Sequence, residues 1–332
     1  MIKNKRIFIF AFLPLLILVV VFFSAVTGSK DVGFFDALKA LIGVGDDNTL
    51  MLVRQLRLPR IIISVIIGGG LAASGCVFQG ILKNPLADPF TLGISGGAAF
   101  GTAVGFVSGL AAVSWLFVPF CAFLGALISV SAVYVLSAQK RFDPNSMILS
   151  GVIISYVFSS AVMLLFALSS ANRLQAAFIW LMGNLSTFDE RLLPAVSAII
   201  TAGTTALCFS GNIINAIALG GDKSRTLGMD IEKNVKVIFL TASLITAAAV
   251  SICGVIGFVG LMIPHIMRKI IGGNNSFLIP ASAFAGAVFL PLCDTLGRSL
   301  FYPVVIPVGV ITSIIGGVFF IFLLLRSDRS IL

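Results

Sequence analysis

The sequence of 332 residues is 58% hydrophobic and only 11% charged, whereas soluble globular proteins carry about 25% charged residues. This composition excludes a soluble globular protein, because no soluble core could bury so much apolar surface. The net charge of +9 then has to be explained by how the charges are distributed along a membrane protein.

Ten apolar stretches have or approach the roughly 20 residues that a helix needs to cross a hydrocarbon core about 30 Å thick. Backbone groups in lipid must bond within their own segment, so the stretches predict helices. They are residues 7–26, 61–82, 92–110, 116–138, 147–168, 192–210, 234–253, 256–268, 279–299 and 306–325. We therefore predict an all-α, polytopic membrane protein of about ten transmembrane helices, in one domain covering residues 1–332.

The first stretch follows Lys3, Lys5 and Arg6, which is also how a secretory signal begins. Its apolar run is longer than the roughly 7 to 15 residues of a signal core, and no A-x-A cleavage site follows it. We interpret it as a retained helix.

The second stretch is preceded by a basic patch, with Arg57 and Arg60 three residues apart and Arg54 three residues earlier. Guanidinium groups pair bidentately with carboxylates, so the patch is suited to an acidic partner, and Arg298 is expected to extend it. The alternative is that these side chains only reach from the membrane toward water.

A polar turn, Lys83 to Pro89, interrupts the chain between the second and third stretches. Pro85 and Pro89 prevent a continuous helix, so this backbone is expected to line a cavity or to be buried in protein. An ordinary cytoplasmic turn is the alternative.

The third stretch carries a glycine at every fourth position. This spacing puts a bare stripe on one helix face, which lets another helix approach closely in lipid. A dinucleotide-binding loop is a poor alternative, because no strand precedes the glycines. The predicted packing residues are Gly93, Gly97, Gly101, Gly105 and Gly109.

The third polar patch lies between the sixth and seventh stretches. Asp222 is a predicted helix N-cap and Gly228 a predicted C-cap, so a short amphipathic helix is expected, suited to docking a soluble partner. It does not match a phosphate-binding loop, because Asp222 and Ile217 stand where glycines are required.

The eighth stretch is short and contains Pro264. Proline removes a backbone donor and breaks helices, so a half-span or a re-entrant element is expected there.

The basic residues are divided unequally between the two sides of the predicted bundle. One side receives fourteen and the other eight of the 22 Lys and Arg residues. Because cytoplasmic loops are enriched in Lys and Arg, both termini are predicted to be cytoplasmic. Topology thus explains most of the positive charge, and no nucleic-acid partner is needed.

Several motifs, in this order and spacing, resemble a known family. They are Arg57-Leu58-Pro59-Arg60; Ser74-Gly75 with Gln79; Asn84-Pro85-Leu86-Ala87-Asp88-Pro89 with Leu92-Gly93; Leu227-Gly228; Gly257-Phe258-Val259-Gly260-Leu261 with Pro264-His265 and Arg268; Asp294 with Arg298; and Pro307-Val308-Gly309. From about residue 50 to 325 the chain resembles the permease subunits of ABC importers for ferric siderophores, haem and vitamin B12, the FecCD type.

The resemblance implies a B12-importer-permease-like bundle in a bacterial cytoplasmic membrane. Its implied partners are a second permease copy, identical or paralogous, two cytoplasmic ATPase subunits, an external or periplasmic substrate-binding protein, and the lipid bilayer. ATP and magnesium would bind to the ATPase, so no cofactor is expected on this chain.

The resemblance also implies roles for particular residues. Arg57, Arg60 and Arg298 match arginines that dock the binding protein. Asn84 and Leu86 match one inner gate, and Asp143, Pro144, Asn145 and Ser146 fall where the family has a second. A segment of about 215–232 matches the ATPase-coupling element, with Leu219, Gly220, Asp222, Ser224, Arg225, Leu227 and Gly228 as its expected contacts.

The rival function is a secondary transporter driven by an ion gradient. Such proteins use ionisable groups inside the membrane, and Asp294 is the main candidate here. His265 is the one histidine in the sequence, so a His-cluster metal site is excluded and no metal site is expected. No paired carboxylates or activated nucleophile indicate an enzyme.

Overall fold

A computed structural model of the chain describes residues 2–28, 32–186, 190–218, 230–301 and 303–326. This part of the chain is helical and contains no strand, which confirms the all-α prediction. Eight helical segments within it are long and apolar enough to cross a membrane. They contain α1 (Ile2–Val26), α4 (Leu58–Ile81), α7 (Phe117–Ala138), α8 (Pro144–Ala167), α10 (Leu193–Phe209), α13 (Ile231–Cys253), α15 (Asn275–Ser299) and α16 (Val308–Arg326).

The other two predicted spans form shorter helices, α5 (Ile94–Val107) and α14 (Val259–Ile271). The remaining described elements are connections. They are α2 (Phe34–Leu41), α3 (Asp47–Leu50), the π-helical turn η1 (Met51–Arg57), the 3₁₀ turns η2 (Pro89–Leu92) and η3 (Glu190–Leu192), α6 (Leu110–Val113), α9 (Ala171–Leu181) and α11 (Gly211–Ala218).

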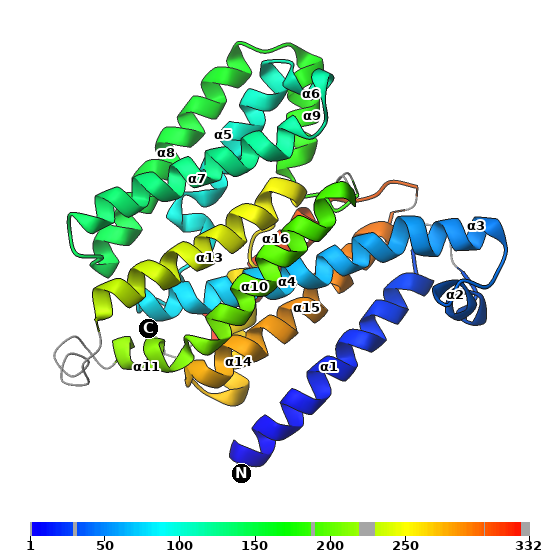
Figure 1. The fold of residues 1–332 in the computed structure, drawn as a ribbon, viewed down its shortest axis with the longest axis horizontal. Coiled ribbons are helices and arrows are strands. Elements are labelled where there is room, and N and C mark those ends of the chain that lie inside the picture. The colour runs from blue at the N-terminus through cyan, green and yellow to red at the C-terminus, as the bar shows by residue number, and fades with distance from the viewer. Residues whose placement is uncertain (1, 29–31, 187–189, 219–229, 302, 327–332) are drawn as a thin grey trace.

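Helix α4 runs through the middle of the bundle, with α13 and α15 on either side of it (Figure 1). Its glycines allow this position. Gly68 of α4 and Gly286 of α15 face each other so closely that a Cβ on either one would collide with the backbone carbonyl of the other. The small side chains let the two backbones touch, which is how helices gain packing contacts in lipid.

A second group of helices, α5, α7, α8 and α9, lies together in the upper part of Figure 1. Helix α5 packs against both α7 and α8, and α13 joins the two groups because it packs on α4 and on α7.

The eighth span is interrupted at a different place from the one predicted. The chain leaves the helix at Gly254, with φ +71°, and α14 begins after Phe258, with φ +68°. Pro264 lies inside α14, which continues to Ile271. With 13 residues, α14 is about 20 Å long at 1.5 Å per residue, too short to cross the hydrocarbon core unaided.

Candidate functional site

One end of the bundle holds an ion pair between Arg60 of α4 and Asp294 of α15. The guanidinium donates to both carboxylate oxygens, from Nε to Oδ2 at 2.9 Å and from Nη2 to Oδ1 at 2.6 Å. Its Nη1 donates to the Ser186 hydroxyl at 2.7 Å. Arg298, one turn after Asp294, places Nε 3.2 Å from Oδ2. Two guanidinium groups therefore share a carboxylate that is 2% exposed.

Arg57 and Arg298 bind the C-terminal end of α1. Arg57 Nη1 donates to the carbonyls of Ala25 and Val26 at 2.6 and 2.9 Å, and Arg298 Nη2 donates to the carbonyl of Ser24 at 3.2 Å. The last carbonyls of a helix lack donors within the helix and form the negative end of its dipole, so cations stabilise them. The two arginines thereby attach α1 to α4 and α15.

These contacts bear on the predicted docking arginines. Arg57 and Arg298 are 4% and 6% exposed, and the contacts above direct their side chains into the bundle. Arg60 leaves 11% of its side chain exposed, whereas Arg54 is exposed. Docking of a binding protein on Arg57, Arg60 and Arg298 stays a prediction, and the geometry gives all three a structural role in addition.

The same ion pair bears on the rival function. Asp294 was the main candidate for binding a coupling ion, but its oxygens are already paired with Arg60 and Arg298. Both carboxylate oxygens are therefore already engaged by guanidinium groups. This arrangement disfavours Asp294 as an ion site.

At the other end of α4, the first predicted gate is an irregular turn, as its two prolines require. Lys83 has φ +51°, and the Asn84 side chain accepts a hydrogen bond from the Leu86 amide at 2.9 Å. Leu86 is 55% exposed. Asn84 therefore shapes the turn, while Leu86 projects from it.

Asp88 closes this turn by capping η2. Its Oδ1 accepts a hydrogen bond from the Phe90 amide at 3.2 Å, and the Thr91 hydroxyl accepts one from the Asp88 amide at 3.4 Å. Asp88 is only 7% exposed. Burial raises its pKa to about 6, and the Phe90 hydrogen bond opposes this shift only in part.

The second predicted gate begins helix α8. The Asp143 carboxylate accepts hydrogen bonds from the Ser146 amide at 3.0 Å and the Ser146 hydroxyl at 3.2 Å, and Pro144 is the first helical residue. An aspartate N-cap followed by proline is a favourable helix start. Asn145 is exposed beside them. The local role of Asp143 and Pro144 is therefore capping.

A pocket of about 350 Å³ lies beside the two predicted gates. Pro144 of the second gate lines it, together with Lys83, which precedes Asn84 of the first gate. Phe142, Ile217 and Asp230 are also part of its lining. The centroid of the Phe142 ring lies 5.2 Å from that of the Tyr134 ring. The Lys236 ammonium lies 5.3 Å from the centroid of the Phe142 ring. Sequence reasoning missed this contact, because no local pattern links Phe142 to α13.

The expected coupling contacts Leu219, Gly220, Asp222, Ser224, Arg225, Leu227 and Gly228 lie outside the described residues. The residues on either side of them are described: α11 ends at Ala218, and Asp230 caps α13 by accepting a hydrogen bond from the Lys233 amide at 3.0 Å. Ile217 and Asp230, which flank the expected contacts on either side, both line the 350 Å³ pocket beside Pro144.

Gln79 of α4 compensates for the proline in α14. Pro264 has no amide hydrogen for the carbonyl of Gly260, four residues earlier. The Gln79 Nε2 lies 3.4 Å from that carbonyl oxygen and 3.3 Å from that of Leu261, while Gln79 Oε1 accepts a hydrogen bond from Arg268 Nη2 at 2.9 Å. This side chain therefore joins α4 to both halves of α14.

The glycine stripe is divided by the ends of α5. Gly97 and Gly101 face α7, where a Cβ on Gly101 would collide with the carbonyl of Cys121. A Cβ on Gly105 would lie at 3.5 Å from Val118, an ordinary contact. Gly93 and Gly109 lie outside the helix with φ +85° and +81°, a conformation that glycine adopts without strain. Only Gly97, Gly101 and Gly105 therefore lie on one face of α5, so the stripe is shorter than the five glycines predicted.

His265 lies among aromatic rings, with its ring centroid 6.0 Å from those of Phe319 and Phe320. Within the described part of the chain, no group of three or more His, Cys, Asp or Glu residues is arranged to hold a metal ion.

The family profile described as the FecCD transport family matches residues 16–326. The iron(3+)-hydroxamate import system permease protein of Bacillus subtilis is 30% identical, with 98% of each chain covered. The hemin transport system permease protein of Yersinia pestis is 33% identical over 83% of this chain and 84% of its own. The cobalamin import system permease protein of Halobacterium salinarum is 36% identical over 85% of this chain and 74% of its own.

A solved structure has a similar fold. It is a transporter described as being of the metal-chelate ABC type, in an inward-facing conformation. It superposes with a TM-score of 0.84 and 28% identity, covering 97% of this chain and all of the other.

Proposed function

The chain belongs to the FecCD transport family of ABC transporter permeases, and we propose that it carries an iron chelate into the cytoplasm. A ferric siderophore is the favoured cargo, with haem and cobalamin as related alternatives. The observation that carries this proposal is the range of its relatives, which are named for iron(3+)-hydroxamate, hemin and cobalamin import. Their common property is a bulky metal chelate.

We place the energy source on a separate protein. The sequence has no phosphate-binding loop in the third polar patch, between α11 and α13, so this chain is proposed to carry out no covalent chemistry and to bind no nucleotide. Two cytoplasmic ATPase subunits would dock on the segment from Leu219 to Gly228. The pocket lined by Ile217, Asp230 and Pro144 supports this assignment, because it places the residues that flank the segment beside the second proposed gate.

The translocation path is proposed to lie between this chain and a second permease copy. Helices α8 and α16 are the natural walls, since they carry strongly exposed apolar side chains such as Tyr156, Met163 and Val318. The path would close toward the cytoplasm at Asn84 and Leu86 and at residues 143–146.

An external binding protein is proposed to deliver the chelate at the end of the bundle that holds Arg54 and Arg60. The chain is a multi-pass membrane protein, and we assign it to the bacterial cytoplasmic membrane, where such a delivery step takes place.

The test is transport in proteoliposomes that contain the chain, its ATPase and its binding protein. Uptake of a radiolabelled ferric hydroxamate should require ATP on the side of the membrane that carries the ATPase. Uptake should persist when ionophores collapse all ion gradients. Deletion of residues 221–226 should abolish uptake while the bundle remains folded. Uptake that stops with the ionophores and continues without the ATPase would establish a secondary transporter instead.

A further inference from the structure

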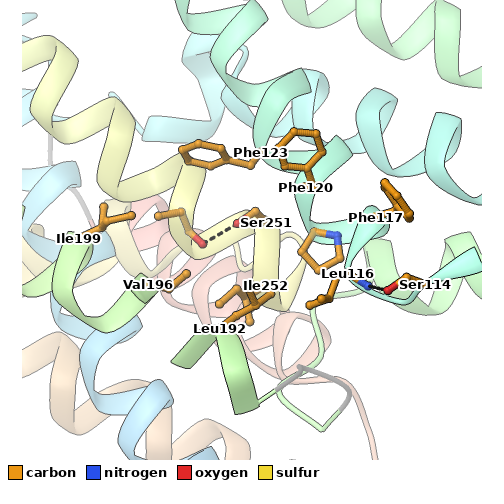
Figure 2. A pocket seen from close by; sticks show the side chains of 12 residues that line it. Ser114, Leu116, Phe117, Phe120, Phe123, Leu192, Val196, Ile199, Ser251 and Ile252 are labelled. Atoms are coloured by element: carbon orange, nitrogen blue, oxygen red, sulfur yellow. Dashed lines mark hydrogen bonds between the residues drawn. The ribbon is translucent and has the colours of Figure 1, made fainter. Parts of the chain in front are cut away.

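A groove of about 590 Å³ runs along α13 between α7 and α10, both of which pack on α13 (Figure 2). Phe117, Phe120 and Phe123 form one wall. They recur every three residues, so they lie on one face of α7. Val196 and Ile199 of α10 form the other wall. The volume lies within the range of about 300 to 1,000 Å³ typical of small-molecule sites.

The polar atoms of this groove are already occupied. The Ser251 hydroxyl donates to the carbonyl of Ala248 at 2.9 Å, and the Ser114 hydroxyl accepts a hydrogen bond from the Leu116 amide at 3.3 Å. The rest of the lining is apolar. Water does not stably fill such a cavity, because it needs two to four polar partners. A polar chelate would likewise find only the two serine hydroxyls as polar side chains here.

The groove lies in one leaflet. It extends from Leu192 to Ile199 on α10 and from Phe117 to Phe123 on α7, which is about 10 Å at 1.5 Å per residue, roughly a third of the hydrocarbon core. These are the ends of α7, α10 and α13 that the basic-residue distribution places outside. Trp115, 41% exposed, precedes one wall, and exposed Glu190 and Arg191 precede the other, as expected at a membrane interface.

The occupant is set by the lining, which is almost entirely apolar, and by the volume of about 590 Å³. A single hydrocarbon chain fits both the size and the chemistry.

We propose that the groove is a specific site for one acyl chain of an outer-leaflet phospholipid, which separates α7 from α10 and packs on Ser251 and Ile252 of α13. This inference does not depend on the cargo or on the energy source of the transporter.

The probe is phosphatidylglycerol with a diazirine in the upper half of one acyl chain, added to the full-length protein in phosphatidylcholine nanodiscs. After irradiation, mass spectrometry should find the label in the peptides containing Phe117–Phe123 and Leu192–Ile199. Labelling should saturate with probe concentration, and unlabelled phosphatidylglycerol should compete with it. Labelling that rises without saturation and is spread over all exposed helices would show bulk lipid only, and would overturn the proposal.

Two substitutions fill the groove, Val196→Trp and Ile199→Phe. Each should lower the labelling of both peptides roughly fivefold or more, because a filled apolar site has no room for a second occupant. Val237→Trp, on a 56% exposed position of α13, is the matched control and should leave labelling unchanged. If either variant fails to fold, the saturation of labelling with probe concentration in the unmodified protein tests the proposal. Cross-links between two copies at Phe120, with no lipid label, would assign the groove to a subunit contact and contradict the proposal.

Discussion

Arg60 binds Asp294 through both carboxylate oxygens, at 2.9 and 2.6 Å, although 234 residues separate them in the sequence. The pair joins the outer ends of the two helices that form the largest interface of the bundle, α4 and α15. Arg298 extends it to α1 through the Ser24 carbonyl. Three helices are therefore held together by one small set of charges.

Replacing Asp294 should unfold this end of the bundle. Asp294→Asn leaves Arg60 and Arg298 without their shared carboxylate, and removing one partner of a buried ion pair costs about 3 to 5 kcal/mol. We expect a large fall in the thermal unfolding midpoint in detergent. Asp47→Asn, on the exposed helix α3, is the control and should change stability by less than about 0.5 kcal/mol. Equal midpoints for the two variants would contradict a stabilising ion pair.

Gln79→Leu should destabilise α14. The variant keeps the apolar volume but leaves the carbonyl freed by Pro264 without a donor, and a buried unsatisfied carbonyl costs about 1 to 3 kcal/mol. Hydrogen exchange should increase in α14 more than elsewhere. The exposed Gln139→Leu serves as the control. If exchange in α14 does not change, Gln79 does not compensate for the proline.

Gly101→Ala should separate α5 from α7. The added methyl would meet the backbone carbonyl of Cys121, which cannot rotate away, and overpacking of this kind costs about 1 to 3 kcal/mol. Gly317→Ala in α16 is the matched control, because nothing lies within 4 Å of its added methyl. That change should be neutral or stabilising by about 0.5 to 1 kcal/mol, since alanine favours helices. The thermal unfolding midpoints of the two variants measure this difference in stability. An equal loss of stability in both variants would contradict a close contact between α5 and α7 at Gly101.

The charge on Asp88 should make stability depend on pH. Because its pKa is raised from 3.8 to about 6 in the folded protein, the folded state holds the proton more tightly than the unfolded state. Its contribution to stability is present below about pH 4 and is lost as pH rises through about 6. Asp88→Asn, which keeps an acceptor for the Phe90 amide, should therefore be more stable than the wild type at pH 7.5.

At about pH 3 the difference in free energy of unfolding should nearly disappear, since the wild-type carboxyl is then mostly neutral in both the folded and the unfolded protein. At pH 7.5 the difference should reach up to about 3 kcal/mol, from about two pKa units at 1.36 kcal/mol each. A difference that is constant between the two pH values would mean that Asp88 is not desolvated as the structure indicates.

Variants of Arg54 and Arg57 should distinguish an effect on docking of the binding protein from an effect on stability. Arg54→Glu changes an exposed charge, so affinity for the binding protein should fall a few-fold, mainly through the association rate, with no change in unfolding midpoint. Arg57→Glu should lower the midpoint as well, because it replaces the group that binds the Ala25 and Val26 carbonyls. Surface plasmon resonance and thermal unfolding measure the two effects. Undiminished docking of Arg54→Glu would place the binding protein elsewhere.

Some features of the candidate site are local and were predictable. Asp143 followed by Pro144 is a helix start in any context, and Pro85 and Pro89 exclude a continuous helix between α4 and α5. By contrast, the directions of Arg57 and Arg298 were not predictable, because their acceptors belong to a helix 32 and 274 residues away in sequence. The basic residues before the second stretch therefore predict a surface, although Arg57 and Arg298 are buried.

The sequence alone determined which stretches form apolar helices, that the chain is all-α, and to which family it belongs. Each of these depends on a stretch of consecutive residues, because the transfer of about 20 apolar residues into lipid needs no partner from elsewhere in the chain. Only the tertiary structure decided which charges neutralise one another, which glycines carry a helix contact, and that α7 and α10 diverge to leave a groove. These properties depend on distances between residues far apart in sequence, and only the packed arrangement of helices sets those distances.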